Sequence, residues 1–477
     1  MTGAVGEPSS DEGHLVLLTG PRGAGKTTCC LRLVGLFRGL RVSIDGVVTE
    51  GGDDDDGRPL QTVVDLGNGV RHHLARAGAS STVEERGPVL DPAAVGVAGP
   101  TLTWHFDDDG LELGRDVLRR CLARDADVVV VDQIGPLELL AGGGWPEALE
   151  VARRRRPLTL LVVNEAVVEA VADRLRDLEP LVVRVRVRDR DALPGLLANL
   201  ALGSRGQRQQ GGCRLLAVDL DGTLLVATPD GHRPIEGAAS ALAGLLRDDV
   251  RIVPSTGRSV ARAREAAAQL GLTSGQAVCF HGAVTADLAD GRWVHRVDLP
   301  AGSASAAVRL AGGRATAYVD DEIWESEGLR EQSDRSGAEP PPRSVAELAA
   351  ELERAHTTRL ILHPEPGTDV SALADRIRAA CPGVRVGQAP GGRLAVHNAL
   401  ASKLSALRRL CERLGVGPDE VVAAGDDLDD ADALAWAGLG VCVSDGHPDA
   451  LAAADVIVPQ SRLAGLLAAL PGLGRSV

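Results

Sequence analysis

Two short apolar runs are each followed at once by a motif that handles phosphate, and this arrangement constrains the fold more than any other feature of the sequence. Residues 15–18 precede a glycine-rich run that ends in Lys26 and Thr27, and residues 215–218 precede Asp219 and Asp221. In α/β folds, ligands bind at the carboxyl ends of the parallel strands. We therefore expect an α/β fold with two phosphate sites, each at the end of a buried strand.

The distribution of lysine points to the same two places. Of the 51 basic residues only Lys26 and Lys403 are lysines, and the others are arginines. Lys403 lies between the Asp219 motif and an acidic run that begins at Asp426. A lysine ammonium is a compact point charge that a planar guanidinium does not reproduce. The two lysines therefore mark positions where phosphate chemistry needs such a charge.

Length and charge limit the classes of protein that the chain can belong to. Its 477 residues exceed what one hydrophobic core usually organises and indicate two or three domains. The net charge of −15 argues against nucleic acid as a partner. The basic run at residues 153–156 is interpreted as a solvated helix end, with a binding patch as the alternative.

The sequence predicts neither a membrane partner nor export. No apolar run approaches the roughly 20 residues that span a bilayer, and residues 2–13 lack the apolar stretch of a signal peptide. The eight cysteines show no zinc-site spacing and are expected to be reduced thiols. We therefore expect a cytoplasmic protein.

Alternating strand-like and helix-like patterns predict a first domain over residues 13–200. The alternation is typical of a mostly parallel sheet with helices on both faces. A polar, glycine-rich linker is predicted at residues 201–212. The strand-like runs are 14–19, 42–49, 128–131, 158–163 and 181–187, and the helix-like runs are 27–37, 114–124 and 165–175.

A second α/β pattern follows the linker. It predicts a core made of residues 213–283 and 397–477, with a less regular module, residues 284–396, inserted as a cap. The predicted strands are 215–218, 250–254, 277–280 and 420–424, and the predicted helices are 236–246, 260–270 and 402–414.

The first motif has the form G-x-x-x-x-G-K-T between a strand and a helix, as a phosphate-binding loop requires. Backbone N–H groups and the helix N-terminus would hold the phosphates of a nucleoside triphosphate, and Lys26 would bridge the β- and γ-phosphates. Thr27 would ligate Mg²⁺, and Asp132 would hold it through water. The predicted nucleotide-binding residues are Gly20, Pro21, Arg22, Gly23, Ala24, Gly25, Lys26, Thr27 and Thr28.

Together with residues 46–50, 62–66 and the run D-Q-I-G-P-L-E-L from Asp132, this loop resembles the cancer-related nucleoside-triphosphatase family over roughly residues 13–180. The resemblance implies a RecA-like fold and slow hydrolysis of nucleoside triphosphates. Gln133 stands where the family has Glu, and an amide positions water without accepting its proton. Two hypotheses remain: hydrolysis, with Glu138 partly substituting, or nucleotide sensing that regulates the second domain.

The second motif places Asp219 and Asp221 on one face of an extended strand end. Asp219 can attack phosphorus to form an aspartyl-phosphate, and Asp221 can protonate the leaving group and then activate water. Carboxylates this close need a counter-cation, and Mg²⁺ supplies it. The sequence therefore predicts a phosphatase acting on a phosphorylated small molecule.

Three further pieces follow in the order that such a site requires. Thr256 and Gly257 end the next strand with a hydroxyl and N–H groups for phosphate oxygens. Lys403 opens a helix and can neutralise both phosphate and nucleophile. An apolar strand over residues 421–424 then leads to Asp426 and Asp430, which are candidate Mg²⁺ ligands.

This set of motifs resembles the haloacid dehalogenase (HAD) superfamily over about residues 213–470, and in particular the Cof-type and sucrose-phosphate phosphatases. The resemblance implies a Rossmann-like core with an α/β cap. It assigns the role of nucleophile to Asp219 and the role of acid and base to Asp221. It assigns phosphate binding to Thr256, Gly257 and Lys403. The Mg²⁺ ligands that it implies are Asp219, Asp426, the backbone carbonyl of Asp221 and, as a further candidate, Asp430.

Two positions depart from the pattern of the Cof-type relatives. His281 stands where these often have Asn, and Asp429 replaces the Asn of the fourth motif. His281 is a candidate substrate contact, with a plain hinge residue as the alternative. The polar cap residues that could bind the substrate are Arg359, His363, Arg393, His397 and Asn398.

The sequence thus predicts a bifunctional protein: a nucleoside-triphosphate site joined to a capped, Mg²⁺-dependent phosphatase. A phosphatase with a nucleotide-sensing domain is the first alternative, and two binding modules without catalysis are the second. No motif names the phosphorylated substrate or the oligomeric state.

Overall fold

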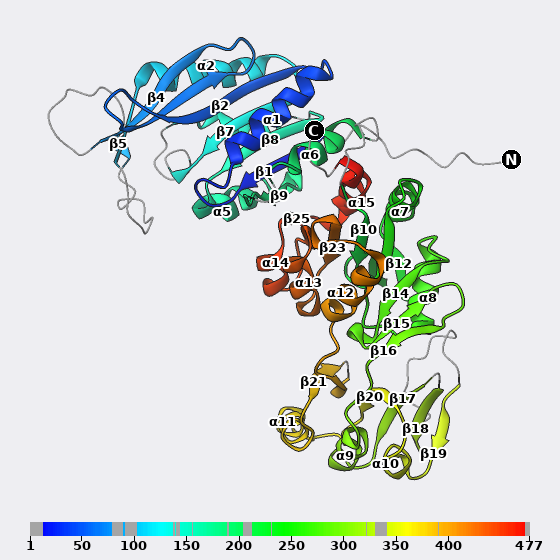
Figure 1. Cartoon of the computed structure of the whole chain (residues 1–477). Helices are drawn as coiled ribbons and strands as arrows, with labels where there is room; N and C mark the ends of the chain where they lie inside the picture. Colours follow the sequence, from blue (N-terminus) through cyan, green and yellow to red (C-terminus); the bar gives the residue numbers. More distant parts are fainter. Residues whose placement is uncertain are drawn as a thin grey trace. The chain divides into compact units, whose positions relative to one another are not determined.

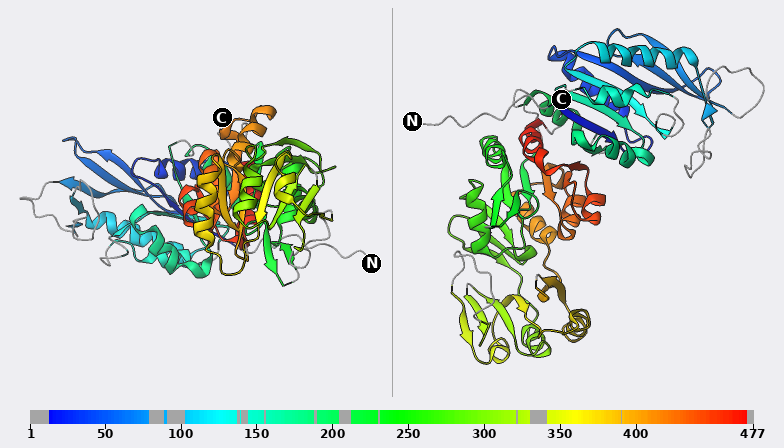
Figure 2. Two further views of the ribbon diagram at one scale, coloured as in Figure 1. Left: turned by 90° about the horizontal axis from the view of Figure 1, so that it is seen from below. Right: turned by 180° about the vertical axis from the view of Figure 1, so that it is seen from behind.

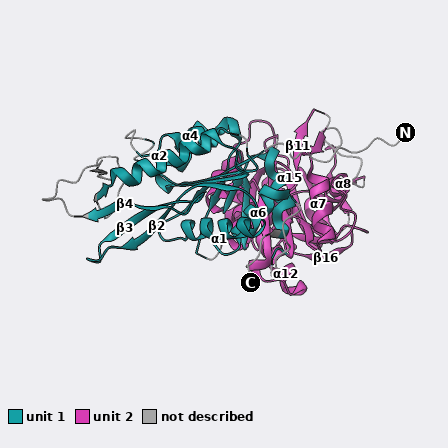
Figure 3. Ribbon diagram, turned by 90° about the horizontal axis from the view of Figure 1, so that it is seen from above, with its two compact units in different colours: residues 1–213, 438–445, 454–477 teal, residues 214–437, 446–453 magenta. Residues whose placement is uncertain are grey.

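The computed structural model describes residues 13–78, 89–90, 103–136, 139, 144–154, 156–187, 190–203, 212–229, 231–320, 322–329, 341–389 and 391–472. The chain divides into two compact units (Figure 3). Unit 1 comprises residues 1–213, 438–445 and 454–477, and unit 2 comprises residues 214–437 and 446–453. Most of the predicted linker (204–211) and Glu138 lie outside the described residues.

Unit 1 is built on one sheet with the strand order β24-β25-β9-β1-β8-β7-β2-β3-β4-β6-β5. Its centre, from β9 to β2, is parallel, and the strands from β2 to β5 pair antiparallel. The strands are β1 (His14–Thr19), β2 (Ile44–Asp53), β3 (Pro59–Asp65), β4 (Arg71–Gly78), β5 (Val89–Leu90), β6 (Thr103–Phe106), β7 (Val128–Ile134), β8 (Leu158–Val163), β9 (Leu181–Arg184), β24 (Leu439–Val443) and β25 (Val456–Val458).

Helices cover both faces of this sheet, with α2 and α4 on one side and α1 and α6 on the other (Figure 3). The central strands are continuous apolar runs because both of their faces are buried, as in Val128–Ile134 of β7. The predicted α/β fold is therefore confirmed. The helices are α1 (Lys26–Gly39), α2 (Asp108–Ala123), α4 (Glu147–Ala152), α5 (Val168–Arg174), α6 (Leu193–Leu202) and α15 (Gln460–Ala469), with short 3₁₀ turns at Glu165–Val167 (η2), Arg176–Leu178 (η3) and Leu470–Gly472 (η8).

Unit 2 has a parallel core in which β10 lies between β13 and β23 (Figure 1). Two smaller antiparallel groups, β11-β12 and β14-β15-β16, flank it. The core elements are β10 (Leu215–Val218), β11 (Leu225–Thr228), β12 (Gly231–Pro234), α7 (Ala238–Arg247), β13 (Arg251–Pro254), α8 (Val260–Gln269), β14 (Gln276–Cys279), η5 (Phe280–Gly282), β15 (Val284–Asp287), β16 (Trp293–Arg296), α12 (Lys403–Leu414), η6 (Pro418–Glu420), β23 (Val421–Gly425), η7 (Leu428–Asp430), α13 (Ala431–Trp436) and α14 (Pro448–Ala453).

The segment that the sequence predicts as a less regular cap forms a six-stranded sheet of order β19-β18-β17-β20-β22-β21. Its three helices pack on one face of that sheet and share a hydrophobic core with it (Figure 2). The strands are short and separated by turns, so their periodicity is weak in the sequence. The elements are α9 (Ser303–Leu310), β17 (Ala315–Val319), β18 (Glu322–Ser326), β19 (Arg343–Val345), α10 (Leu348–Glu351), β20 (Thr357–Leu362), α11 (Val370–Ala380), β21 (Val384–Ala389) and β22 (Arg393–Asn398).

The units do not follow the predicted domain boundaries everywhere. The sequence assigns residues 397–477 to the second domain, whereas residues 438–445 and 454–477 group with unit 1. Within unit 1, β25 pairs antiparallel with β9, with Val456 opposite Val183. The domain boundaries therefore stay a prediction. Among the described helices, none combines the length and apolar character that crossing a bilayer requires.

The cap buries an imidazole whose charge state makes the stability of the fold depend on pH. His397 on β22 is only 5% exposed, and burial, with smaller contributions from nearby cationic groups, lowers its pKa to about 3. The folded state therefore binds a proton more weakly than the unfolded state does. The contribution of this histidine to the stability of the fold is fully present above its ordinary pKa of 6.5. It is lost progressively as the pH falls from 6.5 towards the folded pKa of about 3, because only the unfolded state takes up the proton in this range.

We predict that lowering the pH from 7 to 5 costs the wild type about 2 kcal/mol more unfolding free energy than it costs His397→Gln, because a glutamine does not titrate in this range. Urea unfolding of the full chain at both pH values measures the difference. His356→Gln is the control, because the His356 side chain is 70% exposed. An equal pH dependence in wild type and His397→Gln would contradict the prediction.

Candidate active sites

The glycine-rich loop of unit 1 lies at the carboxyl end of β1 and runs directly into α1. Gly25 precedes the helix with φ of 98°, a left-handed conformation that favours glycine. The Lys26 Nζ donates to the carbonyl oxygens of Gly20 at 2.6 Å and Pro21 at 3.1 Å. Burial lowers the pKa of Lys26, while Asp132 and Glu165 act in the opposite direction. The lysine is therefore held over the loop that it is predicted to serve.

Asp132, at the end of β7, lies against the start of α1. The Thr27 Oγ1 donates to the Asp132 Oδ2 at 2.8 Å, so the two predicted Mg²⁺ residues come together. Thr49, in the middle of β2, donates its backbone N–H to the same oxygen at 3.4 Å and its hydroxyl to the Asp132 carbonyl. The sequence assigns Thr49 no role, although β2 pairs with β7. Burial raises the pKa of Asp132 to about 6.

The structure adds a carboxylate to this site that the sequence argument did not single out. Glu165 begins η2, directly after β8, and β8 lies between β1 and β7 in the sheet. Its charge acts on the Lys26 ammonium and opposes, without outweighing, the lowering of the Lys26 pKa by burial. Gln133 follows Asp132 and is half-buried. Glu165 is thus an exposed carboxylate at the end of the sheet where the phosphate loop lies.

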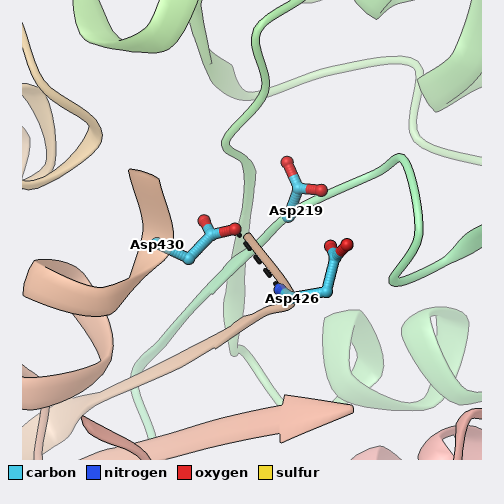
Figure 4. Close-up of side chains that lie close together, drawn as sticks. All are labelled: Asp219, Asp426 and Asp430. Carbon is cyan, nitrogen blue, oxygen red and sulfur yellow. Dashed lines mark hydrogen bonds between the residues drawn. The ribbon is translucent and has the colours of Figure 1, made fainter. Parts of the chain in front are cut away.

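Three carboxylates of unit 2 form one compact group (Figure 4). Asp219 follows β10, and Asp426 and Asp430 follow β23, which is parallel to β10. One oxygen of each carboxylate lies within 4.8 Å of the others. Burial raises the pKa of Asp219 well above its usual range, and the negative charges of Asp430 and Asp426 add to the effect. Burial also raises the pKa of Asp426.

Lys403 joins this group from the first position of α12. Its Nζ donates to Asp219 Oδ1 at 2.7 Å and to Asp430 Oδ1 at 2.8 Å, and its side chain is 4% exposed. Burial alone would lower the pKa of Lys403, but the two carboxylates outweigh it and raise the value. The ammonium is therefore charged and neutralises part of the acidic cluster.

The donor set fits a small hard cation. Carboxylate oxygens are the ligands that Mg²⁺ prefers, and three acids, two of them buried, beside one lysine leave negative charge to be balanced. Asp219, Asp426 and Asp430 would hold the ion, together with the predicted backbone carbonyl of Asp221. These ligand assignments stay predictions.

Two glycines let the acids approach the backbone this closely. A Cβ at Gly222 would lie 2.2 Å from the Asp426 Oδ2, and the φ of Gly222 is +80°. A Cβ at Gly425 would lie 2.3 Å from the Asp430 Cγ. Such distances are far inside van der Waals contact, so neither position has room for a side chain.

Asp221 points to a different partner from the other acids. Its carboxylate accepts from the Arg258 Nε at 2.7 Å and also from the Arg258 Nη2. The backbone N–H of Arg258 in turn donates to the Thr256 Oγ1 at 3.2 Å. The sequence assigns Arg258 no role, but its guanidinium links the predicted acid and base to the predicted phosphate loop.

The two departures from the Cof-type pattern lie in contact with each other. The His281 Nδ1 is 2.6 Å from the Asp429 Oδ2, and this contact is the main reason why the pKa of Asp429 is low. The Arg385 Nη1 of the cap approaches the other oxygen of Asp429 at 3.2 Å. His281 also stacks on His397, with ring centroids 5.4 Å apart. His281 is therefore more than a hinge residue.

The cap candidates divide into two groups. The Arg359 Nη1 donates to the Gly257 carbonyl oxygen at 2.6 Å, so this arginine reaches the phosphate loop. In contrast, the Asn398 Nδ2 donates to the Asp298 carbonyl oxygen at 2.7 Å. The His363 Nε2 lies 3.0 Å from the Thr316 Oγ1, within the cap sheet. Arg393 begins β22, and its charge adds to the burial that lowers the pKa of His363 to about 4.

Comparison with known proteins agrees with the geometry of both units. Residues 216–470 match the family model described as haloacid dehalogenase-like hydrolase, and residues 15–197 match the model described as NTPase. Nucleoside-triphosphatase THEP1 of Methanopyrus kandleri is 34% identical over 178 residues, which cover 36% of this chain and 86% of that protein. THEP1 of Thermofilum pendens is 31% identical over 187 residues, which cover 38% of this chain and 92% of that protein.

Among solved structures, the crystal structure of TM0651 from Thermotoga maritima matches with a TM-score of 0.47 at 21% identity, covering 54% of this chain and 96% of that one. The fold and the family matches define a chain with a haloacid dehalogenase-like hydrolase part and a P-loop part like that of nucleoside-triphosphatases. The chain belongs to the haloacid dehalogenase-like hydrolases through residues 216–470 and to the THEP1-like nucleoside-triphosphatases through residues 15–197. Both resemblances noted in the sequence are thereby confirmed.

We predict that Lys403→Arg lowers the kcat/KM for phosphate-ester hydrolysis more than about tenfold, which corresponds to about 1.4 kcal/mol of transition-state stabilisation. The longer, planar guanidinium cannot occupy the buried point between Asp219 and Asp430 that the ammonium fills. Steady-state kinetics with an aryl phosphate and Mg²⁺ measures the effect. Arg413→Lys, on the exposed side of the same helix, is the control. Wild-type rates in Lys403→Arg would show that the ammonium is incidental.

Proposed function

We propose that the protein is a bifunctional enzyme. Its HAD-type part is a Mg²⁺-dependent phosphomonoester hydrolase that forms an aspartyl-phosphate, and its P-loop part binds and hydrolyses nucleoside triphosphates. The observation that carries the first activity is the buried group of Asp219, Asp426 and Asp430 around the Lys403 ammonium. The substrate is a phosphorylated small molecule, such as a sugar phosphate.

Each step of the proposed hydrolysis is assigned to a residue of the site. Thr256 and Gly257 hold the phosphate oxygens, and the Asp219 carboxylate attacks phosphorus while the bond to the leaving oxygen breaks. Asp221 donates a proton to that oxygen and then takes a proton from the water that attacks the aspartyl-phosphate. Inorganic phosphate leaves and Asp219 is restored. When bound, Mg²⁺ neutralises charge between the carboxylates and the phosphate.

Arg258 has a positioning role in this scheme. Its guanidinium holds both oxygens of Asp221 in the structure. A guanidinium that donates to both oxygens fixes the orientation of the carboxylate. Protonation of Asp221 for the first half requires that this contact loosen. Substrate phosphate near Thr256 provides a competing anion for the guanidinium.

The residues of the P-loop part are compatible with two functions, hydrolysis of a nucleoside triphosphate and nucleotide sensing. Thr27 and Asp132 lie together as a Mg²⁺ pair, and Lys26 lies over the loop. These features support binding of a nucleoside triphosphate. The amide of Gln133 weakens the case for fast turnover, so a nucleotide-sensing domain that regulates the phosphatase is the alternative function.

The domain limits and the cellular location belong to the same proposal. We assign residues 13–200 to the P-loop domain, residues 213–283 and 397–477 to the phosphatase core, and residues 284–396 to the cap. Every one of the eight cysteines is a free thiol. Free thiols suit a reducing compartment, which supports a cytoplasmic enzyme.

The experiment for the phosphatase is removal of its nucleophile. Asp219→Asn should lower aryl phosphate hydrolysis by the full chain at least about a hundredfold, because an amide does not form the covalent intermediate. Asp419→Asn, an exposed acid of the same unit, should leave the rate unchanged. A variant that keeps more than about a hundredth of the wild-type rate would overturn the aspartyl-phosphate mechanism.

The experiment for the P-loop part restores the missing carboxylate. Gln133→Glu should raise the rate of nucleoside-triphosphate hydrolysis at least about tenfold, because general bases typically contribute this much or more. Lys26→Ala supplies the background rate, since it removes the charge that bridges the phosphates. An unchanged rate in Gln133→Glu, with nucleotide binding intact by calorimetry, would favour the sensing function.

A further inference from the structure

A tight turn inside the phosphate loop of unit 1 fixes the position of Arg22. The backbone N–H of Ala24 donates to the Pro21 carbonyl oxygen at 3.2 Å, which closes a turn around Arg22. Gly23 has a φ of 82°, as the second corner of a type II turn requires. The Pro21 carbonyl oxygen also accepts from the Lys26 Nζ at 3.1 Å. Arg22 therefore directly follows a carbonyl oxygen that the predicted phosphate-bridging lysine contacts.

The side chain of Arg22 has an aromatic contact and no acidic partner. Its guanidinium carbon lies over the Trp104 ring, 5.9 Å from the ring centroid, which is within the range of a cation–π contact. Arg22 is exposed, and no carboxylate of the described residues pairs with it. A guanidinium that rests on an aromatic face keeps the N–H donors at its edge available for an anion. The positive charge of Arg22 is therefore positioned without being cancelled.

The Trp104 ring also sets the direction in which Arg22 extends. The loop follows β1, whereas Trp104 lies on β6, and the strands between them have the order β8-β7-β2-β3-β4. The ring is half-buried and packs against the hydrophobic core of unit 1, so its place is fixed. Arg22 therefore extends from the loop towards the side of β1 on which β7 carries Asp132.

The same side of the loop is where the terminal phosphate of a nucleoside triphosphate belongs. The predicted Mg²⁺ residues Thr27 and Asp132 are joined there by a hydrogen bond of 2.8 Å. In P-loop proteins the metal ion bridges the β- and γ-phosphates. A diphosphate lacks the γ-phosphate, so it offers nothing at the place towards which the Arg22 guanidinium extends.

We propose that Arg22 binds the γ-phosphate of a nucleoside triphosphate and that this contact lets the site distinguish triphosphates from diphosphates. Trp104 is a positioning residue that holds the guanidinium beside the loop. The inference rests on the proposed nucleotide-binding function and names the part of the nucleotide that this side chain recognises. It holds for hydrolysis and for nucleotide sensing alike, because both require that a triphosphate be told apart from its diphosphate product.

Calorimetry on the full chain with Mg²⁺ tests the proposal. The probes are the non-hydrolysable β,γ-imido analogues of ATP and GTP, together with ADP and GDP. Arg22→Gln should raise the Kd of the triphosphate analogues at least about tenfold, or about 1.4 kcal/mol, because charge-assisted hydrogen bonds to phosphate are lost. The Kd of the diphosphates should change less than about threefold. An equal change for both kinds of nucleotide, or no change for either, overturns the proposal.

A second pair of variants tests the role of the ring. Trp104→Leu should raise the Kd of the triphosphate analogues about threefold and leave that of the diphosphates unchanged, since the cation–π contact is lost. Trp104→Phe keeps an aromatic face and should restore the wild-type value. A loss in Trp104→Leu that is equal for both kinds of nucleotide, or that Trp104→Phe does not restore, overturns the positioning role.

Two further variants separate this proposal from the function on which it rests. Arg124→Gln is the matched control, because Arg124 is exposed and follows α2 just before β7 begins, at the edge of the sheet opposite the loop. It should leave every Kd unchanged. Lys26→Ala should weaken binding of both kinds of nucleotide. A wild-type chain that binds neither kind removes the nucleotide-binding function itself, whereas intact binding with no selective loss in Arg22→Gln overturns only the role of Arg22.

Discussion

The phosphatase half depends on one buried ammonium among carboxylates. Asp219, Asp426 and Asp430 come from the ends of two parallel strands, and burial raises the pKa of Asp219 and of Asp426. Lys403 stands between two of them and is almost fully buried. Removing a partner from a buried ion pair leaves an uncompensated charge, which costs several kcal/mol. The interaction of Lys403 with the predicted nucleophile Asp219 therefore also holds α12 to the core.

Much of this arrangement could be predicted because strand ends and helix starts are local signals. Parallel strands carry their carboxyl ends to one edge, so Asp219, Thr256 and Asp426 were expected to converge from sequence alone. Likewise Thr27 and Asp132, which follow different strands, come together in the P-loop unit. The apolar runs predicted β1 at His14–Thr19 and β8 at Leu158–Val163 to the residue, whereas the ends of β2, β7 and β9 differ from the predicted runs.

What could not be predicted depends on register and on side-chain direction. The antiparallel strands β4 and β6 are irregular in polarity, so only their pairing reveals them. Arg258 and Thr49 are unremarkable in sequence, and their roles appear only when they are seen to bond Asp221 and Asp132. His281 and Asp429 are 148 residues apart in the sequence, so no local pattern predicts their contact.

The pairing of β25 with β9 bears on how the chain can be divided. β25 lies within residues 216–470, which match the haloacid dehalogenase-like hydrolases, and yet it forms a strand of the sheet of unit 1. A chain cut at the linker would leave that strand with an open edge of unsatisfied backbone groups, which is a template for aggregation. Removal of the residues before the linker is therefore expected to lower the solubility of the remaining C-terminal part. In this respect the sheet of unit 1 depends on residues that match both families.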